Sequence, residues 1–184
     1  MRVLRSISQG IDWINEQVGR AVSWLAVFMV LNVFTVVVLR YVFDVGWVWM
    51  QELYVWSHAT VFMLGAAYTL LHNEHVRIDL IYRNASRRYQ AGVNLLGCVF
   101  LAAPLIYVIF DRSLRMVSRS WGSFEKSAEA GSLPGVFLLK TVIVVFCVLF
   151  GLQVLSLFLK SLRTLLCDDD APEFTDPKDS EPVL

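Results

Sequence analysis

Four long stretches of the chain contain no Asp, Glu, Lys or Arg, and this feature constrains the fold more than any other. They span residues 21–39, 53–71, 89–110 and 141–159, and they hold 79 of the 184 residues but none of the 32 charged side chains. A helix of 19 residues is about 28 Å long, close to the ~30 Å hydrocarbon thickness of a bilayer. The remaining 105 residues are too few to bury four such segments in a soluble protein. The stretches therefore predict an all-α integral membrane fold with four transmembrane helices.

Residues 1–20 carry a different pattern, in which apolar residues recur at steps of three and four between charged ones. No small-residue cleavage site follows, so this segment does not read as a signal peptide. The pattern predicts an amphipathic helix that lies in the membrane interface before the first span. A short helix packed on the protein's own loops is the alternative. The stripe consists of Leu4, Ile7, Ile11, Ile14 and Val18.

The net charge of zero is the sum of two unlike parts. Residues 1–167 carry a net charge of +6, whereas residues 168–184 carry −6 and three prolines. The composition predicts an interfacial helix over 1–20, a four-helix membrane domain over 21–166 and an acidic, disordered tail over 167–184. The balance of 16 basic and 16 acidic residues also disfavours a nucleic-acid partner.

The distribution of Lys and Arg between the stretches predicts the orientation. If both termini are cytoplasmic, ten basic residues lie inside and six outside. Five of those six belong to the connection between the third and fourth stretches, which therefore forms a basic surface on the outer side. They are Arg112, Arg115, Arg119, Lys126 and Lys140.

The stretches lack the groups that ion-coupled carriers and haem proteins keep inside the membrane. His58 is the one histidine within them, either as a functional residue or as an imidazole bonded to a neighbouring helix. No Asp or Glu is available as a proton site. We therefore expect an accessory subunit that is not an enzyme and holds no cofactor or metal, with its chemistry supplied by a partner.

The region from residue 39 to 82 contains an ordered set of short motifs. Leu39-Arg40-Tyr41-Val42-Phe43 leaves the first stretch, and Trp47, Trp49, Gln51, Glu52 and Leu53 lead into the second. Gly65-Ala66-Ala67-Tyr68 and His75-Val76-Arg77-Ile78-Asp79 follow. In order and spacing, this set resembles the small membrane subunit of tripartite ATP-independent periplasmic (TRAP) transporters, the DctQ-like family. Gln51 departs from the pattern, because the family often has an acid there.

These residues also have a physical interpretation as subunit-interface or anchoring positions. Trp47 and Trp49 suit the boundary where the chain enters lipid. Glu52, expected in the first turn of the second span, either caps and anchors that helix or bonds to a partner subunit. Gly65 and Ala66 allow close approach of another helix of this chain or of a partner. His75 and Asp79, four residues apart, share a helix face and are expected to pair.

The resemblance implies a multi-pass protein of the bacterial inner membrane in complex with a larger multi-span subunit. That subunit would hold the sodium sites, and a periplasmic binding protein would deliver an organic acid. The small subunit would brace the large one and help to dock the binding protein, with Arg112, Arg115, Arg119 and Lys126 as the docking surface. Attraction of these side chains to lipid phosphates is the alternative. A stand-alone four-span protein, such as an assembly factor or a self-associating carrier, is the other class considered.

Overall fold

The structure, a computed structural model, describes residues 2–72 and 86–166 and is all helical over these residues. His75, Asp79 and the acidic tail of residues 167–184 lie outside the described residues. The elements in order are α1 (Arg2–Val42), α2 (Val48–Leu71), α4 (Arg87–Gly97), the π-helical turn η1 (Cys98–Ala102), α5 (Ala103–Ser123) and α6 (Val136–Leu166).

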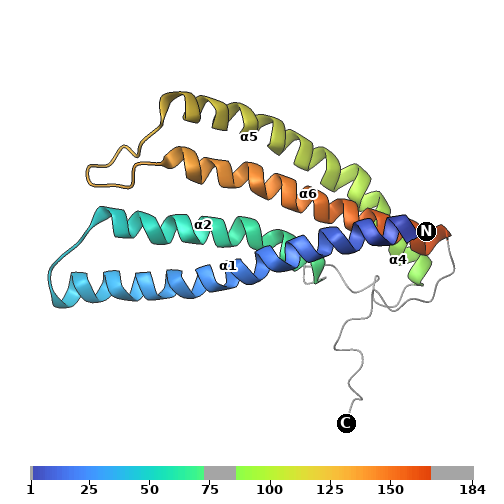
Figure 1. Ribbon diagram of the computed structural model, residues 1–184, viewed down its shortest axis with the longest axis horizontal. Coiled ribbons are helices and arrows are strands. Elements are labelled where there is room, and N and C mark those ends of the chain that lie inside the picture. The colour runs from blue at the N-terminus through green and yellow to red at the C-terminus, as the bar shows by residue number, and fades with distance from the viewer. Residues whose placement is uncertain (1, 73–85, 167–184) are drawn as a thin grey trace, which may run out of the picture.

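The long helices form a layer in the order α1, α2, α6 and α5, and toward the end that holds the N-terminus α1 also packs against α6 (Figure 1). The connections 43–47 and 124–135 meet at one end of this layer, called here the loop end. Many large apolar side chains point away from the neighbouring helices, among them Trp24, Phe62 and Leu101, which are 76%, 74% and 73% exposed. So much exposed apolar surface is stable against lipid or another protein rather than against water.

Three of the described helices are long and apolar enough to cross a membrane, namely Arg5–Val42, Arg88–Ser123 and Val136–Leu166. They contain the first, third and fourth uncharged stretches. The second stretch forms most of α2, which has 24 residues and is not among these three helices. The chain is thus a multi-pass, all-helical membrane protein.

The segment 1–20 and the first uncharged stretch form one continuous helix, α1, of 41 residues. At 1.5 Å per residue this helix is about 60 Å long, roughly twice the hydrocarbon thickness of a bilayer. Ile7 and Ile14 of the predicted apolar stripe are 46% and 41% exposed, while Ile11 of the stripe is buried together with Ser8 and Asn15. The face that packs within the chain is therefore rotated from the stripe, and the exposed isoleucines remain available for the interfacial contact that the sequence predicts.

The third long helix continues through α4, η1 and α5, with the π-helical turn directly before Pro104. Proline lacks an N–H group, and its ring crowds the carbonyl one turn earlier, so a wider turn is a common way to accommodate it. Beside this turn, η1, α5 and α6 border an apolar groove of about 480 Å³ that is lined by Cys98, Cys147 and Phe158, among others.

Candidate functional site at the loop end of the helical layer

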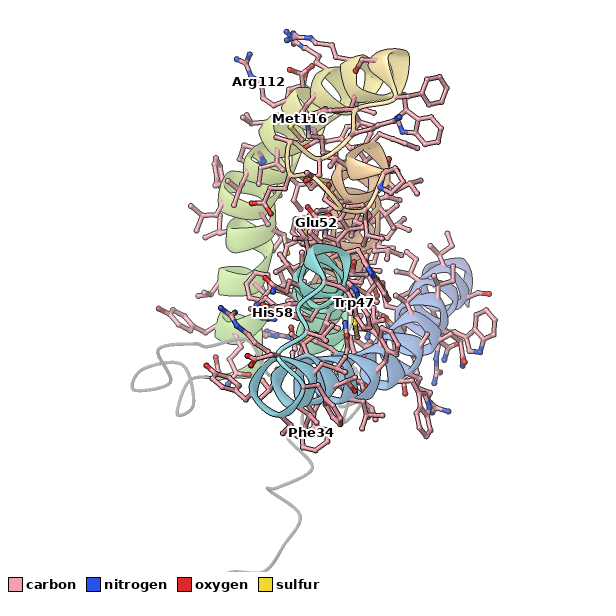
Figure 2. The ribbon with its side chains drawn as sticks, turned by 90° about the vertical axis from the view of Figure 1, so that its left-hand side faces the viewer. Phe34, Trp47, Glu52, His58, Arg112 and Met116 are labelled. Carbon is pink, nitrogen blue, oxygen red and sulfur yellow. The ribbon has the colours of Figure 1, made fainter. Side chains whose placement is uncertain are left out.

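Glu52 ties the start of α2 to the connection between α5 and α6. Its Oε1 accepts a hydrogen bond of 2.5 Å from the Ser127 hydroxyl, and its Oε2 accepts one of 2.7 Å from the backbone N–H of Leu133. Because α2 begins at Val48, Glu52 is the fifth helical residue, so the expected first-turn position is wrong. The carboxylate faces this connection (Figure 2), and both of its oxygens have partners within the chain.

The two tryptophans before Glu52 lie at the same end of the layer. The Trp47 and Trp49 rings stack with their centroids 6.3 Å apart, and the side chains are 47% and 41% exposed. Asn32 of α1 donates a hydrogen bond to the carbonyl of Met50, which fixes the start of α2 against α1. Partly exposed indoles at a helix start suit a boundary between lipid and water.

The connection between α5 and α6 is held to both helices by polar contacts. Glu125 pairs with Lys140 and also accepts a hydrogen bond from Ser120. The bond from Lys140, and then that from Ser120, lowers the pKa of the Glu125 carboxyl below its usual value of 4.5. Trp121 donates to the Thr141 hydroxyl at 3.0 Å. These contacts hold the connection in a fixed position over the loop end.

The predicted basic surface is present on the outward side of α5 (Figure 2). Arg112, Arg115 and Arg119 are exposed, whereas Ser113 and Val117 on the opposite face are buried. Asp111 binds Arg115 at 2.5 Å. Among the described residues, neither Arg112 nor Arg119 has a hydrogen-bond acceptor or an ion pair within 4 Å, although Arg112 also interacts electrostatically with Asp111.

A hollow of about 330 Å³ lies along this surface, lined by all three arginines and Lys140. Lys126 is exposed farther along the connection and does not line the hollow. A hollow with two unpaired guanidinium groups is suited to carboxylate or phosphate groups.

The small and polar residues of α2 do not all face the neighbouring helices. Ala67 is buried at 1% exposure, while a side chain added at Gly65 would meet nothing within 4 Å. Ala66 is half-buried. His58 is exposed, and none of its hydrogen-bonding atoms has a partner in the described chain. It is the eleventh of the 24 residues of α2, so it lies nearer the middle of the helix than the sequence indicates.

α1 and α2 pack tightly at a different glycine, Gly19. A Cβ atom placed there would lie 2.0 Å from Cδ2 of Tyr68. The Tyr68 ring also lies against His72, and His72 Nε2 is 2.9 Å from a carboxylate oxygen of Glu16. The sequence motifs did not indicate this contact, although small residues are a usual means by which two membrane helices approach closely.

A polar cluster joins α1 to α6 toward the end opposite the loop end, and the sequence analysis missed it as well. The Asp12 carboxylate accepts hydrogen bonds from Gln153 and Ser156 and pairs with Lys160 at 2.7 Å. Asn15 donates to Gln153 at 2.7 Å. The signal was available as Asp12 and Asn15 three residues apart, and as Gln153, Ser156 and Lys160 at steps of three and four.

Across residues 2–72 and 86–166, no three His, Cys, Asp or Glu side chains are grouped as metal ligands would be. The loop end instead joins exposed tryptophans, a tethered connection and a basic hollow on a set of apolar helices. These features define a membrane-embedded helical component with a polar surface at one end.

Comparison with protein families gives a specific assignment. Residues 29–164 match the family described as tripartite ATP-independent periplasmic transporters, DctQ component. This match covers most of the chain, including all of α2, α4 and α5 and nearly all of α6. No curated protein and no solved structure matches the chain significantly. The chain belongs to the DctQ family and is a small membrane subunit of a TRAP transporter, as its motifs predict.

Proposed function

We propose that the chain is the scaffold subunit of a sodium-coupled TRAP transporter in the bacterial inner membrane. It braces a larger membrane subunit, which holds the sodium sites and imports an organic acid delivered by a periplasmic binding protein. The family match over residues 29–164 is the observation that carries this proposal. The exposed apolar side chains support it, because a layer with so little buried surface gains stability from a membrane partner.

In this proposal α2 also crosses the membrane, so that the chain has four spans, and both termini are cytoplasmic. The 24 residues of α2 are long enough to cross the hydrocarbon region, and α2 runs antiparallel to α1 (Figure 1). Its polar side chains near the loop end are consistent with this, because Glu52 bonds to the connection between α5 and α6. The loop end then faces the periplasm, where the binding protein arrives.

The basic surface is proposed to help dock that binding protein. Charge complementarity mainly raises the rate and specificity of association. Arg112 and Arg119 are the residues best placed to act, because Arg115 is already paired with Asp111. An acidic patch on the binding protein would meet the hollow at the loop end.

Co-expression with the large membrane subunit tests the scaffold role. After extraction in mild detergent, we expect the two chains to purify together. Proteoliposomes that contain both chains should take up an organic acid only when sodium and the binding protein are added. Recovery of this chain only as a homo-oligomer would contradict the proposal and favour the stand-alone alternative.

Charge reversal at the loop end tests the docking role separately. Arg112→Glu and Arg119→Glu should each slow uptake by roughly two- to tenfold at low salt, with a smaller effect at high salt. Arg40→Glu is the matched control, because Arg40 is exposed at the end of α1, on the far edge of the layer. Equal effects of all three changes, or uptake that does not change with salt, would favour lipid phosphates as the contact of these arginines.

A further inference from the structure

One face of α2 is unoccupied and has the spacing of a helix-packing seam. Val55 and Phe62 on this face are 52% and 74% exposed, and His58 is exposed between them. The buried residues Ser57 and Ala67 lie on the opposite side, against the neighbouring helices. We call this face the outer seam; it consists of Gln51, Val55, His58, Phe62, Gly65 and Thr69.

The outer seam alternates steps of four and three residues, which is a repeat of 3.5. This repeat keeps one line of side chains facing a second helix that crosses at a shallow angle. A surface covered by lipid alone does not require it. The seam also includes Gly65, where a side chain would meet nothing within 4 Å, so the backbone is open to close approach by another helix.

If lipid alone covered the outer seam, the imidazole of His58 would lack hydrogen-bond partners, which is unfavourable in free energy. His58 is about 15 Å along the helix from Val48, which places it well inside the hydrocarbon region if α2 spans the membrane. A neutral imidazole has one donor and one acceptor nitrogen, and hydrocarbon satisfies neither. No described residue of the chain satisfies them either. The missing partner therefore lies outside the described residues, as in a second chain that packs on this face.

We infer that the outer seam binds a transmembrane helix of the large membrane subunit. That helix would place a hydroxyl or a protonated carboxyl group opposite His58 and would approach closely at Gly65. This inference rests on the proposed function, because it takes the large subunit as the partner. It adds the surface that is used and the chemistry of the group that meets it.

A second copy of this chain fits the seam less well. In a symmetric dimer of parallel helices, His58 would face His58 at the same level. Two neutral imidazoles form one hydrogen bond with each other, and one donor and one acceptor remain unsatisfied. A hydroxyl or a protonated carboxyl group pairs with one nitrogen of His58, and a different chain, which is free of this symmetry, can place a second polar group at the other nitrogen.

Photocrosslinking identifies what covers the seam. The photoreactive analogue p-benzoylphenylalanine replaces Phe62, or in the matched control Phe34, in the chain co-expressed with an epitope-tagged large subunit. Phe34 is 66% exposed and points away from α2 at the edge of the layer (Figure 2). We expect an adduct with the large subunit from position 62 in clear excess over position 34. An adduct with a second copy of this chain, or equal yields from both positions, would overturn the inference.

Substitutions measure what the seam contributes. His58→Leu should reduce the fraction recovered with the large subunit by roughly three- to tenfold, the effect of one interhelical hydrogen bond in a membrane. His58→Gln, which keeps a donor and an acceptor, should restore much of the loss. Gly65→Leu should also reduce recovery, whereas Gly97→Leu is the control, because a side chain there also meets nothing within 4 Å.

The two proposals fail in different ways. If the unmodified chain is not recovered with the large subunit, the proposed function and the seam both fail. If the unmodified chain is recovered with it but neither Leu substitution lowers recovery, the seam alone is wrong.

Discussion

Two ion pairs in this chain each contain an aspartate, but the two pairs differ in their exposure to solvent. Asp12 and Lys160 are 19% and 16% exposed, whereas Asp111 and Arg115 are 37% and 58% exposed. Water screens the exposed pair, so that pair adds little stability. The ammonium group of Lys160 loses much of its hydration at this position, and its attraction to the Asp12 carboxylate offsets this loss.

Removing the carboxylate charge should therefore have unequal consequences at the two sites. We expect Asp12→Asn to lower the free energy of unfolding by about 2–3 kcal/mol, because it leaves Lys160 partly buried without a counter-charge. Asp111→Asn should cost about 1 kcal/mol or less. Thermal unfolding in one detergent, followed by circular dichroism, compares the two variants. Equal shifts would mean that the Asp12 cluster is as well hydrated as the surface.

Glu125 provides a prediction about pH. Its pKa is lowered in the folded chain, first by the hydrogen bond from Lys140, so its contribution to stability is present above the usual pKa of 4.5. That contribution is lost as the pH falls through the lowered pKa. We expect the ¹³C NMR titration of the Glu125 carboxyl carbon to have its midpoint below 4.5, and Lys140→Gln to move the midpoint upward. A midpoint unchanged by Lys140→Gln would contradict the pairing.

The residues of the site were predictable in kind but not in their partners. The tryptophans, Glu52 and the arginines stood out by their spacing in the sequence. However, Glu52 bonds to residues 75 and 81 positions away, and Asp12 to one 144 positions away. No local pattern encodes which distant residue meets a carboxylate. The fold brings these partners together through the packing of α1, α2 and α6.

At the scale of the elements, absence of charge predicted where the helices are but not where they begin. The second stretch starts at residue 53, whereas α2 starts at Val48. Glu52 is tolerated inside the helix because its carboxylate reaches Ser127 and the backbone of Leu133. The same shift moves His58 toward the middle of α2. An imidazole at this depth needs a hydrogen-bond partner, and the inference about the outer seam depends on this need.

The crossing of α1 and α2 is testable with two glycines of the same helix. Glycine to alanine normally stabilises a helix by up to about 1 kcal/mol, and Gly10→Ala should do so, because its added Cβ meets nothing within 4 Å. Gly19→Ala should instead destabilise by about 1–3 kcal/mol, because the new Cβ overlaps the Tyr68 ring. Thermal unfolding of both variants measures the difference. A stabilised Gly19→Ala variant would mean that the helices do not approach closely there.

For the whole molecule, the layered arrangement explains why so little of the chain is buried. Each of α1 and α5 lies at an edge of the layer, and even the central helices keep apolar residues on the outside, such as Phe62 of α2 (Figure 1). A layer of this kind has two broad surfaces. Lipid suffices for one that is apolar throughout, whereas the surface with His58 carries a polar group whose hydrogen bonds hydrocarbon does not satisfy.

The same arrangement places the two short connections at one end of the layer, and the proposed topology puts that end in the periplasm, which leads to a prediction about orientation. Gly46 and Lys126 are exposed in these connections, whereas Leu166 is 66% exposed at the opposite end of α6. In a background with the native cysteines replaced by alanine, Gly46→Cys and Lys126→Cys should react with a membrane-impermeant maleimide added to intact spheroplasts. Leu166→Cys should react only after lysis. Reaction of Leu166→Cys alone in intact spheroplasts would reverse the orientation, and it would place the basic hollow in the cytoplasm, where no periplasmic binding protein could reach it.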